Sequence, residues 1–250
     1  MRVAVLADIH GNLPALDAVL AEAEAAGADV IVLNGDMATG PMPAQTLERL
    51  AGLGERAVWV RGNCERELAG AWDGTLDPDL PEVARVPAEY CAAQLERAHR
   101  DLLDGLPLSV TLEVTGLGPV RFCHATAVSD TAIVLVDSPV AGFRAGFADV
   151  TEATVVLGHT HMPFDRLADR RRFVNPGSVG MPYGRPGGHW ALLSGGDVSL
   201  RRVEIDVEAA IAAVIAGSTY PGRAAWAEEY LRAESSDADA IAAFGPRDGR

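Results

Sequence analysis

The chain has 250 residues, of which 48% are hydrophobic and 22% charged, a balance typical of a globular protein with a sizeable core. Its formal net charge of −14 argues against non-specific binding to nucleic acid through phosphate contacts. All 21 basic residues are arginine, so a phosphate-loop lysine, a Schiff-base lysine and a lysine general base are excluded.

The cysteines and the N-terminal residues indicate in which cellular compartment the protein is expected. Cys64, Cys91 and Cys123 form neither a CxxC pair nor an even disulfide framework, which predicts reduced thiols in a cytoplasmic protein. The apolar run within residues 1–8 is too short for a signal peptide, and no apolar stretch approaches the length of a membrane span. We therefore expect a cytoplasmic protein that makes no membrane contact.

The first part of the chain alternates between short apolar segments and segments with apolar residues at helical spacing. Strands are predicted at residues 2–7, 29–33 and 57–60, and helices at residues 13–26 and 43–53. The first helix has the clearest limits, because Asn12 is a good N-cap, Pro14 suits a first turn and Gly27 is a good stop. This alternation predicts a parallel sheet with helices on its faces.

The second part of the chain favours antiparallel pairing. Residues 72–87 are rich in aspartate and proline and are predicted to form a loop, and residues 87–104 are predicted to form one helix. Alternating apolar residues around glycine-rich turns then predict hairpins at residues 110–124 and 190–205, with a short buried strand at residues 154–157 between them.

No linker and no internal repeat divides the chain. We predict an α/β fold of the layered α+β kind, with two mixed β-sheets packed as a sandwich and flanked by helices. One domain is expected over residues 1–233, ending in helices at residues 207–216 and 223–233. Residues 234–250 are mostly small or polar, which predicts a poorly ordered C-terminal tail.

Polar side chains follow five of the predicted strands, at the points where the strands end. They are Asp8 and His10, Asp36, Asn63, His124, and the pair His159 and His161. Taken singly, each has an ordinary structural explanation, such as a helix cap, a turn residue or a hydrogen-bonded core histidine. Ligands of α/β sheets gather at the carboxyl ends of strands, so the repeated position favours a shared site.

These seven side chains offer imidazole nitrogens and carboxylate or amide oxygens. Such donors suit Mn²⁺, Fe or Zn²⁺ rather than a soft thiolate site. One metal would use four to six of them, and a pair of metals could use all seven.

The same residues form an ordered set of motifs. Asp8-Ile9-His10, Gly35-Asp36, Gly62-Asn63-Cys64, His124 and Gly158-His159-Thr160-His161 follow the order D-x-H, G-D, G-N-[HC], H and G-H-x-H. In this order they resemble the calcineurin-like metallophosphoesterase superfamily, over roughly residues 1–180. The segment 175–180 further resembles the small bacterial phosphodiesterase branch. The resemblance implies a β-sandwich core flanked by helices, and a site for two metal ions.

The resemblance also implies a role for each motif residue. The first metal would be held by Asp8, His10 and His161, and the second by Asn63, His124 and His159. Asp36 would bridge both. Two divalent ions are expected, with Mn²⁺ favoured and Fe or Zn²⁺ as alternatives. Asp36, Asn63, Cys64 and His124 are the residues expected to take part in catalysis.

Cys64 departs from the commonest family pattern. Many relatives carry at this position a histidine that stabilises the phosphate or protonates the leaving group. A thiol with a pKa of about 8.5 is neutral at pH 7 and a weak hydrogen-bond donor. We therefore expect better turnover of esters with acidic leaving groups than of alkyl phosphates. The alternative is that Cys64 only fills a small buried space.

Two arginines follow site loops and could contact substrate phosphate, because a guanidinium suits bidentate phosphate binding. Arg66 follows the Asn63 loop, and Arg185 follows the loop at residues 175–180. The alternative for each is a surface arginine without a role in binding.

The leading functional hypothesis is metal-dependent hydrolysis of phosphate esters, more readily of diesters than of monoesters. The substrate would be a small phosphate ester or nucleotide, with a dinucleoside polyphosphate or a phosphoprotein as alternatives. A non-catalytic scaffold of the same fold is the rival from another class. It is disfavoured because all seven ligand positions are filled. Homo-oligomerisation stays open.

Overall fold

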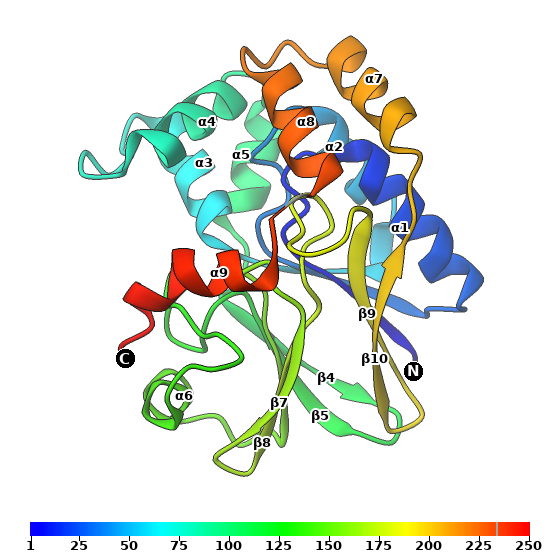
Figure 1. Cartoon of the computed structure of the whole chain (residues 1–250), viewed down its shortest axis with the longest axis vertical. Coiled ribbons are helices and arrows are strands. Elements are labelled where there is room, and N and C mark those ends of the chain that lie inside the picture. Colours follow the sequence, from blue (N-terminus) through cyan, green and yellow to red (C-terminus); the bar gives the residue numbers. More distant parts are fainter. Residues whose placement is uncertain (234) are drawn as a thin grey trace.

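The computed structural model describes residues 1–233 and 235–250 as two five-stranded sheets packed against each other, with helices outside (Figure 1). The strand order is β10-β9-β1-β2-β3 in sheet A and β4-β5-β6-β8-β7 in sheet B. The predicted sandwich of two mixed sheets flanked by helices is confirmed. None of the helices in the described part of the chain is both long and apolar enough to span a bilayer.

Sheet A contains the parallel strands predicted from the first part of the chain. Its strands are β1 (Val3–Leu6), β2 (Val30–Asn34), β3 (Ala57–Val60), β9 (Gly188–Ser194) and β10 (Asp197–Val203). Strands β1, β2 and β3 are parallel, and the β9–β10 hairpin adds antiparallel strands beside β1. The carboxyl ends of the parallel strands therefore lie along one edge.

Sheet B comes from the middle of the chain. Its strands are β4 (Ser109–Val114), β5 (Gly118–Cys123), β6 (Thr154–Val156), β7 (Phe164–Ala168) and β8 (Arg171–Asn175). Strands β5, β6 and β8 are parallel, while β4 and β7 are antiparallel at the two edges. The predicted hairpins at residues 110–124 and 190–205 are present, whereas β7 was not predicted.

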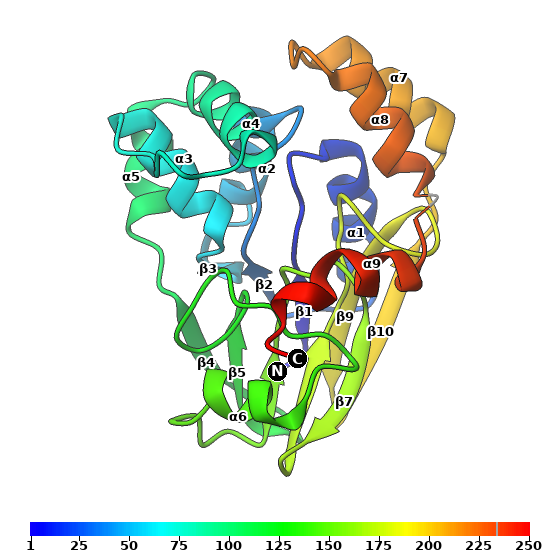
Figure 2. The same ribbon diagram turned by 60° about the vertical axis from the view of Figure 1, so that its left-hand side comes forward.

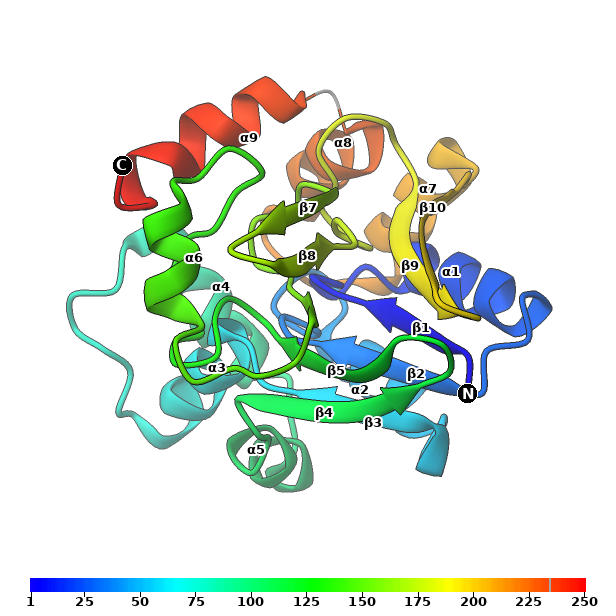
Figure 3. The same ribbon diagram turned by 90° about the horizontal axis from the view of Figure 1, so that it is seen from below.

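The helices cover both outer faces and one end of the sandwich (Figures 1 and 3). They are α1 (Leu13–Ala25), α2 (Pro43–Ala51), α3 (Asn63–Asp73), α4 (Glu82–Ala92), α5 (Arg97–Asp104), α6 (Val140–Gly146), α7 (Val207–Gly217), α8 (Arg223–Arg232) and α9 (Asp237–Phe244). Short 3₁₀ turns occur at Gly54–Arg56 and Gly245–Arg247. The start of α1 is as predicted, because the side chain of Asn12 accepts a hydrogen bond from the backbone nitrogen of Ala15 at 3.2 Å.

A valine-rich cluster fills the space between the two sheets, and further apolar clusters lie under the outer helices. Strand β1 illustrates the pattern, since Val3 and Val5 belong to the cluster between the sheets and Ala4 and Leu6 to the cluster under the helices. A strand buried on both faces is apolar at every position, which explains why the parallel strands are continuous apolar runs.

The prediction of a single helix at residues 87–104 is wrong, because the structure has two helices in this region. Helix α4 begins at Glu82, inside the predicted loop, and carries Pro87 within it. The chain leaves the helical conformation before Glu96, which has the extended dihedral angles φ −98° and ψ 165°. His99 Nδ1 accepts a hydrogen bond from the backbone nitrogen of Glu96 at 3.2 Å, which caps the start of α5.

The C-terminal segment is more ordered than the composition predicted. Helix α9 begins with a capping box in which Ser236 and Asp239 accept each other's backbone N–H groups. Ala240 of this helix is fully buried against the apolar cluster under sheet B, and Phe244 packs on the same cluster. Residues 235–250 therefore pack on the sandwich, while residue 234 of the predicted tail lies outside the described residues.

Candidate metal centre

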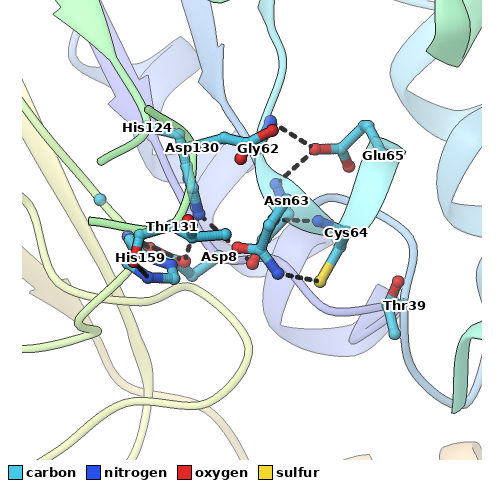
Figure 4. Close-up of polar contacts among 12 residues, drawn as sticks. Asp8, Thr39, Gly62, Asn63, Cys64, Glu65, His124, Asp130, Thr131 and His159 are labelled. Carbon is cyan, nitrogen blue, oxygen red and sulfur yellow. Dashed lines mark hydrogen bonds and ion pairs between the residues drawn. The ribbon is translucent and has the colours of Figure 1, made fainter. Parts of the chain in front are cut away.

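The seven predicted donor side chains come together at the edge where the carboxyl ends of both sheets meet. Asp8 follows β1 and His124 follows β5, yet Asp8 Oδ1 lies 3.9 Å from His124 Nε2. The backbone nitrogen of Gly158, after β6, donates to the carbonyl of His124 at 2.7 Å. Figure 4 shows Asp8, Asn63, His124 and His159 converging on one point. Long-range sheet packing therefore assembles residues from five loops.

Most of these residues have an unusual backbone conformation. Five of the seven have a positive φ, which L-residues other than glycine rarely adopt: Asp8 (55°), His10 (50°), Asp36 (55°), His159 (67°) and His161 (55°). Each such residue costs on the order of 1–2 kcal/mol, and strain of this kind gathers at functional sites. These turns redirect the side chains from the strand direction into the centre.

Glycines beside the donors allow the close approach of the loops. A Cβ on Gly35 would lie 2.7 Å from Cγ of His124, and a Cβ on Gly62 would lie 2.8 Å from the backbone nitrogen of Asp36. Gly35 also has a φ of +89°. The glycines of the G-D and G-N motifs are therefore required by packing around the donor side chains.

Three of the four histidines are oriented by a backbone carbonyl that accepts from Nδ1, which leaves Nε2 facing the centre. These contacts join His10 to Thr39 at 3.1 Å, His124 to Asn34 at 2.8 Å and His161 to Met181 at 3.0 Å. Carbonyl contacts of this kind fix the ring orientation of metal-binding histidines in general.

His159 has the opposite arrangement. Its Nε2 donates to the carbonyl of Thr131 at 3.2 Å, so Nδ1 is the nitrogen left for the centre. Its backbone nitrogen donates to both carboxylate oxygens of Asp8, at 3.1 and 3.0 Å. Thr131 had no signal in the sequence, because only the tertiary structure brings its loop beside His159.

The two carboxylates are buried and face the imidazoles. Burial raises the pKa of Asp8, but His161 and His124 outweigh it, so the pKa lies below its ordinary value. Burial likewise raises the pKa of Asp36, and His124 and His10 bring it far below the ordinary value. Both groups are therefore ionised at neutral pH.

The pKa values of the four histidines shift in opposite directions. Burial lowers the pKa of His124, but Asp36 and Asp8 raise it to about 10. The pKa of His161 is also raised in total, because Asp8 outweighs burial. Burial and His124 lower the pKa of His159 to about 4, and burial with His161 lowers that of His10.

Two buried atoms of the centre have no hydrogen-bond partner in the described part of the chain. They are Oδ1 of Asn63 and Nε2 of His124. Nδ2 of Asn63 faces Glu67 Oε1 at 3.2 Å, which directs Oδ1 elsewhere. Buried polar atoms are normally satisfied, so free electron-pair donors at this point fit a cation.

Three overlapping groups of side chains place their potential ligand atoms within 4.8 Å of one another. The groups are Asp8, His10 and His161; Asp36, His124 and His159; and His10, Asp36 and Cys64. Asp36 belongs to two of them, and its Oδ2 lies 3.3 Å from His124 Nε2 and 3.9 Å from His10 Nε2. The carboxylate of Asp36 therefore lies between the two halves of the cluster.

Cys64 lies in the first turn of α3 beside Asp36. Its backbone nitrogen donates to Asp36 Oδ1 at 2.9 Å, and its side chain is buried. Burial, Asp36 and Glu67 raise the pKa of the thiol well above its ordinary value. The thiol is therefore protonated at neutral pH and is a weak donor beside the centre.

The two predicted phosphate-binding arginines lie in different surroundings. Arg66 makes a bidentate ion pair with Asp130, with its Nε at 3.0 Å and its Nη2 at 3.2 Å. Arg185 is exposed and lines a cavity of about 610 Å³ together with His189 and Arg202. Among the described residues, no hydrogen bond joins either guanidinium to the seven donor side chains.

Glu65 and Asn175 hold the site loops in position. The carboxylate of Glu65 is fully buried and accepts from the backbone nitrogens of Asp36, Met37 and Gly62, each at 2.8 Å. Nδ2 of Asn175 donates to the carbonyl of Gly158 at 2.7 Å. A glutamate three residues into a helix is a common capping signal, but its reach to the Asp36 loop was not visible in the sequence.

Comparison with known proteins identifies the family of this chain. The model of the calcineurin-like phosphoesterase superfamily domain matches residues 1–196. Phosphodiesterase YfcE of Escherichia coli (strain K12) is 35% identical over 77 residues, which are 27% of this chain and 42% of that protein. The alignment thus spans less than half the length of this curated relative.

Solved structures support the same fold at lower identity. Hypothetical protein PH1004 from Pyrococcus horikoshii OT3 has a TM-score of 0.76 at 22% identity, covering 94% of this chain and 99% of that one. A metallophosphoesterase from Sphaerobacter thermophilus has a TM-score of 0.71 at 24% identity, covering 93% and 99%. With the matched domain and this fold, the chain belongs to the calcineurin-like phosphoesterase superfamily.

Proposed function

We propose that this protein hydrolyses phosphate diesters with the help of two divalent metal ions held by the seven donor side chains. The observation that carries the proposal is the pair of unpartnered buried atoms, Asn63 Oδ1 and His124 Nε2, beside two ionised carboxylates. Unsatisfied donors of electron pairs at this depth are costly unless a cation binds them.

The overlapping groups support a division of the ligands. Asp8, His10 and His161 would hold one ion, and His124 and His159 the other. Asn63, whose Oδ1 has no partner among the described residues, would complete the second set. The position of Asp36 between the His10 and His124 rings suits a bridging carboxylate. The mixed imidazole and carboxylate donors suit Mn²⁺, Fe or Zn²⁺, and we take Mn²⁺ as the ion to test first.

A pair of divalent ions at such a site supplies an activated water and neutralises charge on the attacking and leaving oxygens of an in-line displacement. The contribution of the protein itself is to fix and orient the side chains that would bind the metal ions. Three backbone carbonyls hold the imidazoles of His10, His124 and His161 in place, and Glu65 holds the Asp36 loop. The protonated thiol of Cys64 offers only a weak hydrogen bond to a leaving group.

The charges around the centre favour a diester over a monoester. A diester carries one negative charge, whereas a monoester carries close to two at neutral pH. Arg66 is neutralised by Asp130, and Glu65 and Glu67 are buried close to Asp36. With Arg66 already paired and two glutamates nearby, the added negative charge of the dianion is disfavoured. YfcE, the relative described above, is itself named a phosphodiesterase.

The test is hydrolysis of bis(p-nitrophenyl) phosphate and p-nitrophenyl phosphate by protein depleted of metal and then loaded with Mn²⁺. We expect turnover that requires the metal and a higher kcat/KM for the diester. Absence of metal-dependent turnover on either ester would instead favour a non-catalytic member of the superfamily. A higher kcat/KM for the monoester would overturn the diester assignment while leaving the esterase intact.

A further inference from the structure

Two arginines beside the centre share one carboxylate, which is not among the predicted metal ligands. Besides its bidentate contact with Arg66, the carboxylate of Asp130 lies 3.7 Å from Nε of Arg61. Asp130 is buried, whereas both guanidiniums are partly exposed. Nε of Arg61 has no hydrogen-bond partner in the part of the chain that the structure describes. The two guanidiniums therefore offer more donors than this single carboxylate accepts.

The ion-pair cluster adjoins the second half of the centre through Asn63. Nη2 of Arg66 lies 3.8 Å from Oε1 of Glu67, and the same oxygen accepts from Nδ2 of Asn63 at 3.2 Å. One carboxylate thus separates the guanidinium of Arg66 from a predicted metal ligand. Because Glu67 is engaged by Asn63, Asp130 is the anion that both guanidiniums share.

The cluster also adjoins the centre through His159. Thr131 directly follows Asp130, and its carbonyl accepts from His159 Nε2 at 3.2 Å (Figure 4). Figure 2 shows the loop between β5 and α6, which carries both residues, passing beside the start of α3, where Arg66 lies. The charge of Asp130 is therefore close to two side chains proposed to bind the same ion.

The loop that carries Asp130 has its own internal hydrogen bonds. The backbone nitrogen of Thr126 donates to the carbonyl of Ser129 at 2.9 Å, and the backbone nitrogen of Ser129 donates to Thr126 Oγ1 at 3.0 Å. Oγ of Ser129 accepts from the backbone nitrogen of Thr131 at 3.2 Å. Apolar residues 133–135 of the same loop are buried in the cluster under sheet B. Replacing the carboxylate by its neutral amide therefore removes a charge while these contacts keep the loop in place.

Two neighbouring guanidiniums are a suitable site for the oxygens of a phosphate group. In this protein the carboxylate of Asp130 takes the place of such an oxyanion. A second negative charge on a phosphate ester at the centre would be repelled by this carboxylate and would find both guanidiniums engaged. A singly charged diester avoids this repulsion.

We propose that Asp130 is a specificity-determining residue, an internal anion that occupies a two-arginine site and thereby excludes the second negative charge of phosphate monoesters. The inference rests on the proposed phosphodiesterase function and names the residue that sets its substrate class. Asp130 is not among the seven donors, so its charge can be removed without removing a metal ligand.

The test compares two substrates with the same leaving group, methyl p-nitrophenyl phosphate and p-nitrophenyl phosphate, which differ in charge. Asp130→Asn keeps the size of the side chain and removes the anion from the two guanidiniums. It should raise the ratio of monoester to diester kcat/KM by about 5- to 30-fold, the effect of one charge that acts beyond direct contact. The kcat/KM for the methyl ester should change far less, because this substrate carries a single negative charge.

A second variant separates the effect of charge from that of loop structure. Arg66→Gln leaves Asp130 with one guanidinium fewer and should lower the ratio of monoester to diester kcat/KM. The double variant Asp130→Asn/Arg66→Gln loses one charge of each sign and should return the ratio close to that of the wild type, whereas a distorted loop would not be repaired. Asp165→Asn, at an exposed carboxylate paired with Arg172, is the matched control and should leave the ratio unchanged.

Two results would overturn the inference. One is an unchanged ratio in Asp130→Asn. The other is a double variant whose ratio is no closer to that of the wild type than the ratio of Asp130→Asn.

Binding provides a readout that does not depend on turnover. By titration calorimetry of the Mn²⁺-loaded protein, Asp130→Asn should bind inorganic phosphate about 5- to 30-fold more tightly than the wild type, and dimethyl phosphate with unchanged affinity. If the wild type hydrolyses neither ester, the proposed function fails, and this binding difference still decides the role of Asp130. Equal affinity of the two proteins for inorganic phosphate would overturn the inference even if the esterase activity is present.

Discussion

The carboxylate of Asp36 lies 3.3 Å from Nε2 of His124, and both side chains are buried where the two sheets meet. The two residues follow β2 of sheet A and β5 of sheet B, so their contact joins the two halves of the sandwich. The same carboxylate oxygen is 3.9 Å from His10 Nε2. The Asp36 carboxylate therefore lies between an imidazole from each of two distant loops.

Replacement of this carboxylate should abolish function. We expect Asp36→Asn to lower metal-dependent kcat/KM by more than the roughly 10- to 100-fold typical of losing a residue that only orients a ligand. The bound metal per chain, measured by elemental analysis, should fall with it. Asp17→Asn, at an exposed carboxylate paired with Arg49, is the matched control and should keep both. Full activity of Asp36→Asn would show that it is not the bridging ligand.

Cys64 should set the preference between monoesters and diesters. A histidine at this position can donate a proton to the leaving group, whereas the buried thiol has a raised pKa and is a weak donor. We expect Cys64→His to raise the ratio of monoester to diester kcat/KM, at most by the roughly 10²- to 10⁴-fold that a general acid contributes. Cys64→Ser is the control and should keep the ratio close to that of the wild type. An unchanged ratio in Cys64→His would remove the residue from leaving-group chemistry.

Gly62 should be essential for the centre rather than for the fold. A Cβ there would lie 2.8 Å from the backbone nitrogen of Asp36 and would overlap its carboxylate. We expect Gly62→Ala to lower metal content and activity at least tenfold, at a cost in stability of about 1–3 kcal/mol from the added atom. Gly52→Ala is a matched control, because its nearest neighbour would be at an ordinary 3.4 Å. Equal metal content in the two variants would contradict the steric argument.

Glu65 should contribute to stability even without metal. Its carboxylate accepts from three backbone nitrogens, and the amide of a glutamine would point a donor at one of them. We expect Glu65→Gln to lower the free energy of unfolding of the metal-free protein by about 1–3 kcal/mol. Urea unfolding measures this change. The control is Glu48→Gln, at an exposed position of α2, which should change the free energy of unfolding by less than about 0.5 kcal/mol. An equally small effect of Glu65→Gln would show that Glu65 does not stabilise the metal-free protein.

Sequence patterns predicted the sheets well because their signal is local. The apolar runs of β1, β2 and β3 and the turn residues of the hairpins are visible within a few neighbouring residues. The errors fall where tertiary contacts decide the structure. Helix α9 is rich in small and polar residues, but the burial of Ala240 against the second sheet stabilises it.

In the candidate metal centre, too, local motifs were predictable and tertiary contacts were not. The spacing of motifs such as Gly158-His159-Thr160-His161 indicated which residues would meet, and the structure brings the two carboxylates and four imidazoles among the predicted donors together. The fate of Arg66 could not be predicted, because Asp130 lies 64 residues away in the sequence. The ion-pair partner of an arginine near a site can be identified only when the fold is known.

The sequence by itself determined the family and the layered fold and predicted the seven candidate donors, because short motifs at strand ends need only local order to be recognised. Only the tertiary structure decided which nitrogen of each ring faces the centre. The carbonyl of Asn34, which fixes His124, is 90 residues away from it. The positive φ of Asp8 and Asp36 and the ion pairs of Asp130 beside the centre are likewise set by contacts between distant segments. Such contacts depend on how the two sheets pack, which no local pattern encodes.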